Sequence, residues 1–198
     1  MTGNMEEREL KDRLNLIESM IAEGRRSTES WGWTFVLWGA AYYIAIAWSI
    51  WGRASLAWPV TMTIAFVTTG LVASRMGRNR PVRTLTRAII SVWIATGISL
   101  FVVMMSLGLS GRADPHTSVA VVGSMLGLAN ATSSMILKWK LQLACAVFWW
   151  GAAVAACFGS NAQTSVVFLV AIFFGQIVFG IYCMIREAQK RKLETAHA

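Results

Sequence analysis

The chain has 198 residues, of which 56% are hydrophobic and 14% are charged, and its formal net charge is +8. A soluble domain usually has about 25% charged residues, so this composition excludes an ordinary soluble enzyme. The hydrophobic residues form long blocks of the length that a helix needs to cross a bilayer. We therefore expect an all-α integral membrane protein.

Residues 1–30 come before the first apolar block, and we expect them to form a short cytoplasmic amphipathic helix and a linker. They are rich in charge and lack an apolar core with a cleavage site, so we do not expect a signal peptide. Spacings of 4, 3 and 4 place four apolar side chains on one seam of the helix: Leu10, Leu14, Ile17 and Ile21. Gly24 is predicted to end this helix.

The apolar seam needs a partner, because a helix this short is not stable alone in water. Residues 5–23 carry six acidic side chains against three basic ones. A helix that lies on a membrane surface usually has a basic polar face instead. We therefore expect a protein partner for the seam. It is a second copy of the chain, another cytoplasmic protein, or the loops of the chain's own bundle.

Six apolar segments are predicted to cross the membrane, and together they make a transmembrane domain over residues 31–185. None contains Asp, Glu, Lys, Arg or His, which argues against a proton relay or an ion pathway. A basic tail, residues 186–198, follows the last segment. The predicted spans are 33–52, 57–74, 88–109, 117–137, 141–158 and 164–185.

The basic residues predict the orientation. All Lys and Arg residues except Arg53 and Arg112 lie before span one, between spans two and three, between spans four and five, or after span six. By the positive-inside rule, both termini are cytoplasmic. We expect a cell membrane, of the prokaryotic cytoplasmic type, with anionic lipids at its inner leaflet. The basic loop Arg75–Arg87 is short and lies next to the membrane, so we do not expect a nucleic-acid partner.

A weak internal similarity suggests a three-fold repeat of helical hairpins. Trp38 is followed by Gly-Ala-Ala in span one, and Trp150 is followed by the same three residues in span five. Span three has a looser counterpart at Trp93. The alternative is coincidence, in a chain with 10 tryptophans. A true repeat would predict a pseudo-threefold bundle of parallel repeats.

Small residues predict where the helices pack. Gly123, Gly127 and Ala131 recur every four residues in span four, and Gly151 lies in span five. Such residues let helix backbones approach closely in a membrane, where association depends on packing and hydrogen bonds. The pattern does not distinguish a partner helix in the same chain from one in another protomer.

Two amides lie deep in the spans, Asn130 and Gln176. Each is costly against lipid, so we expect both to face the bundle interior. There they act either as clamps between helices or as part of a cavity for a neutral solute. Aromatic side chains could add a wall for an apolar or cationic ligand, or simply pack. These are Tyr42, Trp38, Trp93 and Trp150.

The sequence offers little for catalysis. His116 and His197 have no metal-ligand companion at useful spacing, and we expect both to be solvated. The three cysteines lie inside spans without a paired motif. No phosphate-binding loop, dinucleotide fingerprint or nucleophile elbow is present. We therefore predict no catalytic residues, no metal and no cofactor, and a protein that is not an enzyme.

Two functions remain open. The first is a non-catalytic assembly, signalling or partner-binding module that self-associates, with the N-terminal helix as its contact surface. The second is a channel or facilitator for uncharged, apolar or organic-cation solutes, which would use the amides and tryptophans. A water-accessible path past Asn130 and Gln176 would favour transport, and a dry interior would favour assembly.

Overall fold

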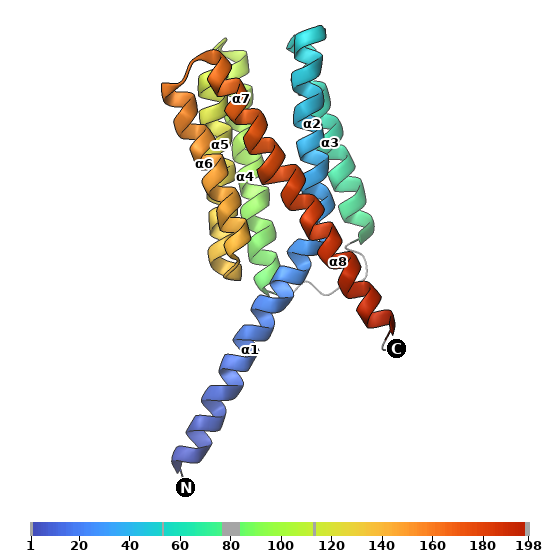
Figure 1. Cartoon of the computed structure of the whole chain (residues 1–198), viewed down its shortest axis with the longest axis vertical. Helices are drawn as coiled ribbons and strands as arrows, with labels where there is room; N and C mark the ends of the chain where they lie inside the picture. Colours follow the sequence, from blue (N-terminus) through green and yellow to red (C-terminus); the bar gives the residue numbers. More distant parts are fainter. Residues whose placement is uncertain (1, 53, 77–83, 113, 197–198) are drawn as a thin grey trace.

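A computed structural model describes residues 2–52, 54–76, 84–112 and 114–196, and these residues form helices and short connections without a strand (Figure 1). The π-helix η2 joins α7 to α8. The elements are α1 Thr2–Ser30, α2 Gly32–Trp51, α3 Ala54–Met76, α4 Thr84–Leu109, α5 Pro115–Leu137, α6 Lys140–Phe158, α7 Asn161–Ile172, η2 Phe173–Val178 and α8 Phe179–Ala196.

Six helical stretches among the described residues are long and apolar enough to cross a membrane. This confirms the predicted all-α class and the number of candidate spans. Most of the stretches extend past the predicted spans, the last one as far as Leu193, because helical geometry continues where the apolar run ends. The first stretch ends at Trp51, one residue before its predicted end. The stretches are Gly32–Trp51, Leu56–Arg75, Leu85–Leu109, Pro115–Leu137, Lys140–Phe158 and Asn161–Leu193.

The N-terminal helix is longer than predicted. It does not end at Gly24 but continues to Ser30, and only Trp31 separates it from α2. Gly24 is buried in the helix, where a Cβ atom would lie 2.7 Å from Leu137 Cδ2 and 3.0 Å from Leu85 Cδ2. The prediction of a helix end was wrong because this glycine serves a close contact between helices.

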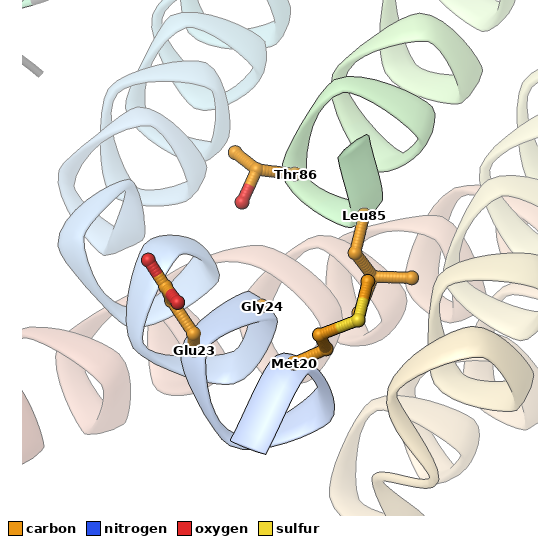
Figure 2. A pocket seen from close by; sticks show the side chains of 5 residues that line it. All are labelled: Met20, Glu23, Gly24, Leu85 and Thr86. Carbon is orange, nitrogen blue, oxygen red and sulfur yellow. The ribbon is translucent and has the colours of Figure 1, made fainter. Parts of the chain in front are cut away.

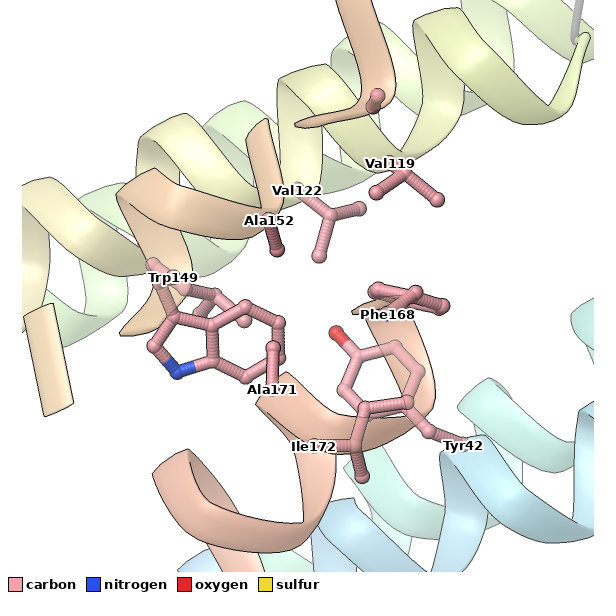
Figure 3. Close-up of a cluster of buried hydrophobic side chains, with 10 residues drawn as sticks. Tyr42, Val119, Val122, Trp149, Ala152, Phe168, Ala171 and Ile172 are labelled. Atoms are coloured by element: carbon pink, nitrogen blue, oxygen red, sulfur yellow. The ribbon is translucent and has the colours of Figure 1, made fainter. Parts of the chain in front are cut away.

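Figure 1 shows the arrangement of the helices. The α2–α3 hairpin stands on one side, and α4, α5 and α6 form a group on the other. The rod made by α7, η2 and α8 crosses between them, and α1 projects beyond the bundle. The main core lies where these parts meet (Figure 3), and its buried side chains are Tyr42, Val119, Val122, Leu126, Trp149, Ala152, Ala156, Phe168, Ala171 and Ile172.

Helices α5 and α6 pack against each other at glycines. A Cβ atom at Gly123 would lie 2.7 Å from the Trp149 carbonyl oxygen, and one at Gly127 would lie 2.3 Å from Trp150 Cδ1. Ala131, further along α5, is also buried. Gly151 differs from these residues, because it is exposed and no described atom of another helix lies within 4 Å of its Cβ position. Its predicted packing role therefore has no partner in the described part of the chain.

A second close contact joins α2 to the rod, and the sequence analysis did not find it. A Cβ atom at Gly32 would lie 2.8 Å from the Gly180 carbonyl oxygen, and one at Gly180 would lie 2.7 Å from the Gly32 carbonyl oxygen. Further along α2, a Cβ atom at Gly39 would lie 2.8 Å from Ile177 Cγ1. The two backbones therefore approach closely at Gly32 and Gly180, where the side chains of Cys183 and Val36 also leave no room for a Cβ atom.

The start of α5 is held to the neighbouring helix ends. Asp114 caps α5 by accepting a hydrogen bond from the Thr117 backbone at 3.0 Å, and hydrogen bonds from Thr117 lower the pKa of the Asp114 carboxyl. His116 Nδ1 lies 2.7 Å from the Ala156 carbonyl oxygen, and Nε2 lies 2.5 Å from Asn161 Oδ1. His116 is half-buried rather than enclosed, so the ring stays accessible to solvent while it joins three helix ends. His197 lies outside the described residues.

The two glycine environments predict opposite outcomes for the same substitution. Gly123→Ala forces a methyl group against the backbone of α6, so we expect it to lower the free energy of unfolding by about 1–3 kcal/mol. Gly151→Ala places the methyl group in open space, so it should be neutral or slightly stabilising, by up to about 1 kcal/mol. Unfolding of the detergent-solubilised protein by added SDS measures both. Equal effects at the two positions would contradict the α5–α6 packing.

Candidate functional site

The apolar seam of α1 is uncovered over most of its length. Leu10 is 60% exposed, Leu14 is 52% exposed and Ile17 is 51% exposed, whereas Ile21 is half-buried. No described segment of the same chain covers the first three side chains, and Figure 1 shows this half of α1 beyond the end of the bundle. Of the three partners expected for the seam, the chain's own bundle therefore reaches only its last residue.

Exposed ion pairs support the helix in this projecting half. Lys11 Nζ lies 2.6 Å from Glu7 Oε1, and Arg13 Nη2 lies 2.6 Å from Glu9 Oε1. Each pair spans four residues of one helix, an arrangement worth a few tenths of a kcal/mol. These pairs contribute to helix formation, but they do not bury the seam.

The base of α1, residues 20–29, is attached to the bundle, and Arg25 makes one attachment. Its Nε donates to the Leu137 carbonyl oxygen at 2.7 Å, and its Nη2 donates to the Lys138 carbonyl oxygen. Lys138 ends α5 in a left-handed conformation with φ 50°. The last carbonyls of a helix have no partner within the helix, so the guanidinium of Arg25 supplies the missing donors.

Glu29 and Lys190 make the second attachment, between the base of α1 and α8. Glu29 is only 5% exposed and forms an ion pair with Lys190 Nζ. An unpaired carboxylate at this depth would be costly, so the position of α8 and the burial of Glu29 depend on each other. The sequence analysis missed this pair. The feature of the sequence that could have indicated it is Glu29, an acidic side chain just before the first predicted span.

The third attachment is to the start of α4. Figure 2 shows the narrow crevice where Met20, Glu23 and Gly24 of α1 face Leu85 and Thr86 of α4. A shallower groove of about 250 Å³ lies on another side of the base, between α1 and the end of α5. It is lined by Glu18, Ile21, Ala22, Arg25 and Lys138. The base of α1 therefore contacts α4, α5 and α8, while the half before it projects.

The second candidate region is a set of amides inside the bundle. Asn130 and Gln176 are buried, as expected, and the structure adds Gln142, which is fully buried in α6. Asn130 Nδ2 donates to the Leu126 carbonyl oxygen at 2.9 Å, within its own helix. Among the described residues, its Oδ1 has no hydrogen-bond partner, and neither does Gln176 Oε1 or either amide atom of Gln142. For Asn130, the observed hydrogen bond is not the expected clamp between helices.

Gln176 lies in the π-helix η2, whose wider turn interrupts the regular helix between α7 and α8. Trp149 packs against this segment, since a Cβ atom at Gly175 would lie 2.5 Å from Trp149 Nε1. The indole N–H of Trp149 and the hydroxyl of Ser133 also lack partners in the described part of the chain. Short π segments occur frequently at functional sites. The sequence analysis overlooked Gln142 and Ser133 because it treated only the amides deepest in the spans.

The four aromatic candidates do not form one wall. Tyr42 is buried in the main core, 6.0 Å from the Phe168 ring centre (Figure 3), and Trp93 packs edge-on against Phe35 at 5.1 Å. Trp38 is half-buried on α2, whereas Trp150 is 38% exposed on α6. The four side chains therefore do not share one surface. The ring contacts of Tyr42 and Trp93 account for these two residues by packing, without a ligand.

No group of three or more metal-ligating side chains occurs among the residues that the structure describes. Cys145 and Cys183 are buried in a second apolar cluster with Phe35 and Phe179. Comparisons with protein-family models, with curated proteins and with solved structures found no match to this chain. The function must therefore be argued from the projecting helix and the buried amides themselves.

The Glu29–Lys190 pair predicts a coupled effect on stability. Lys190→Met leaves the buried Glu29 carboxylate without its cation. Because Lys190 itself is 39% exposed, we expect a loss of about 1–3 kcal/mol in unfolding free energy, less than for a fully buried pair. Adding Glu29→Gln should recover most of this loss.

The matched control is Arg191→Met on the same helix, which removes an ion pair with Glu187 whose arginine is exposed. It should change the free energy of unfolding by less than about 1 kcal/mol. SDS unfolding of the purified chain compares all three variants. A double variant as unstable as Lys190→Met alone would show that the ion pair does not hold α1 to α8.

Proposed function

We propose that this protein is a non-catalytic, membrane-embedded assembly or partner-binding module whose α1 binds a protein. One observation carries the proposal: Leu10, Leu14 and Ile17 form an exposed apolar seam on a helix whose base is attached to the bundle. Covering such side chains is favourable by roughly 25 cal/mol per Å² of apolar surface. The acidic excess of residues 5–23 favours a protein over a lipid surface as the cover.

The attachment of α1 suits it to signalling as well as to assembly. Only Trp31 separates α1 from α2, and α2 packs backbone to backbone against α8 at Gly32 and Gly180. Lys190, further along α8, forms an ion pair with Glu29 of α1. A partner that moves α1 therefore acts on both α2 and α8 through short, well-packed contacts rather than through a flexible linker.

We further propose that both termini are cytoplasmic, in a membrane of the prokaryotic cytoplasmic type. Support comes from the basic residues that gather at the base of α1, where Arg25 binds the end of α5 and Lys190 binds Glu29. Figure 1 shows α1 and the end of α8 at the same end of the bundle. Anionic headgroups of the inner leaflet would lie next to these basic side chains. Residues 77–83 of the basic loop lie outside the described residues.

The three-fold hairpin repeat stays a prediction. The two matching motifs have different surroundings, because Gly39 lies against Ile177 and Gln176 while Gly151 faces open space. If the repeat exists, the hairpins share their order and direction, but the matching glycines Gly39 and Gly151 do not make equivalent contacts.

The proposal predicts position-specific crosslinking. A photo-reactive amino acid at Leu14, in the full chain in its native membrane, should form a protein adduct. The same group at Asp12, on the opposite side of the helix, should give at least about fivefold less. Adding Leu10→Ser and Ile17→Ser should reduce the Leu14 adduct, because both remove apolar surface from the seam. Denaturing gels measure the adduct, and its absence at Leu14 would reject the proposed function.

A second candidate function, a channel or facilitator for uncharged, apolar or organic-cation solutes, is favoured by one observation. Asn130, Gln142 and Gln176 hold amide atoms without partners inside the bundle, which are groups that a neutral solute could bind. The same atoms are sealed from solvent in this conformation, which supports assembly over an open pore.

Solute flux and stability separate the two functions. We expect vesicles containing the purified chain to pass glycerol no faster than empty vesicles. We also expect Gln142→Leu to keep or raise the free energy of unfolding, because it removes a buried polar group that has no partner. Saturable flux that Gln176→Leu abolishes, with folding intact, would favour the channel instead.

A further inference from the structure

We propose that the partner of α1 is a further copy of this chain, and that the projecting halves of α1 join in a parallel, in-register coiled coil. This inference rests on the proposed function, since it names the partner of the same seam. It follows from two observations and one physical argument: where the seam is open, which charges flank it, and how insertion in a common membrane would orient the helices.

The open part of the seam has the register of a coiled coil. Spacings of 4, 3 and 4 place Leu10 and Ile17 at positions d and Leu14 and Ile21 at positions a of a seven-residue repeat. The next d position is Gly24, which is buried against Leu137 and Leu85 of the chain's own bundle. The same stripe is therefore covered from within the chain near the membrane and open further out, where another helix can continue the contact.

The flanking charges select a copy of the same helix. In a parallel coiled coil, the g residue of one helix meets the e residue five positions later on its neighbour. Here Arg13 occupies g and Glu18 occupies e, and both are exposed, so Arg13 of one copy meets Glu18 of the other. The sequence supplies a second pair of opposite sign at the same spacing, Glu6 and Lys11.

The same charges also select the register. A shift by one repeat in one direction brings Arg13 against Arg25 and Glu6 against Glu18. On the other side of the same shifted coil, Arg13 meets Lys11. Like charges at these positions are destabilising, so of these arrangements only the unshifted one pairs opposite charges at both g-to-e contacts, although it also brings Glu7, at position a, against its own copy.

Insertion in one membrane would make the α1 helices parallel and would raise their local concentration. Copies inserted in one bilayer with the same topology present α1 on the same side and with the same polarity, as a parallel coil requires. Two repeats are too short to associate firmly as free peptides, but anchoring raises their effective concentration. Leu14 at a with Ile17 at d is a combination that favours more than two strands. The g-to-e pairing applies between neighbours in any parallel assembly.

Disulfide crosslinking tests the arrangement in membranes that contain the full chain. With a mild oxidant, Leu14→Cys should link to itself and give a dimer-sized band, because equivalent a positions face each other in an in-register parallel coil. Asp12→Cys, on the outer face, is the matched control, and it should link at least about tenfold less. The parent chain, with Cys145, Cys157 and Cys183, sets the background. A link that forms only between Leu14→Cys and Ile17→Cys would indicate antiparallel helices and overturn the proposal.

Charge reversal tests the register. Arg13→Glu or Glu18→Arg alone should lower the Leu14→Cys crosslink roughly fivefold, because each turns attractive pairs into repulsive ones. The double reversal should restore it, and Asp12→Arg should have little effect. Both the Arg13 and the Glu18 side chains are exposed, and Glu18 lies beside the groove at the end of α5, so unchanged SDS unfolding of the variants verifies that the bundle still folds. Single reversals without effect would overturn the assigned register.

The photo-crosslinking experiment at Leu14 distinguishes a failure of self-association from a failure of the proposed function. An adduct of twice the chain mass that contains only this chain supports self-association. An adduct with a different protein, together with no Leu14→Cys self-link, overturns self-association but leaves the proposed function standing. No adduct of either kind rejects both.

Discussion

Close backbone approach at glycine is the interaction on which this architecture depends. Inside a bilayer, an apolar side chain gains little by contacting another helix rather than lipid, so helices associate where small residues permit tight packing. Gly123 brings α5 against the backbone of α6, and Gly32 and Gly180 bring α2 against α8. Gly175 lets Trp149 of α6 reach the π segment of the rod, which connects these two contacts. Together they position the rod between the two helix groups.

The position of α1 follows from these contacts. Because Gly32 fixes the start of α2 against α8, the residues just before it enter the base of the bundle at a defined place. Glu29 is buried there and takes its cation from Lys190, and Arg25 supplies donors to the open carbonyls at the end of α5. Polar groups at the edge of the bundle thus fix the base of a helix whose outer half projects beyond the bundle. The attached base and the uncovered apolar seam are the two features on which the proposed binding role rests.

In contrast to the paired polar groups at the base of α1, the interior of the bundle contains polar groups with too few hydrogen-bond partners. Asn130, Gln142 and Gln176 are all buried, and each has at least one amide atom without a partner among the described residues. Such groups cost stability, and natural proteins keep few of them. Their retention beside a π segment makes this region the part of the bundle to compare between conformations. In the present conformation it is closed, and the binding surface that we propose lies on α1.

The sequence by itself determined the all-α class, the six candidate spans and the apolar seam, because each depends on the order of apolar and polar residues along one helix. It also identified Asn130 and Gln176 as buried, since an amide in a long apolar run has to avoid lipid. Only the tertiary structure decided that Gly24 packs rather than ends a helix, that Gly151 has no neighbour, and that Glu29 meets Lys190. These features depend on which helix faces which, and residues as far apart as Glu29 and Lys190 leave no local pattern that would pair them.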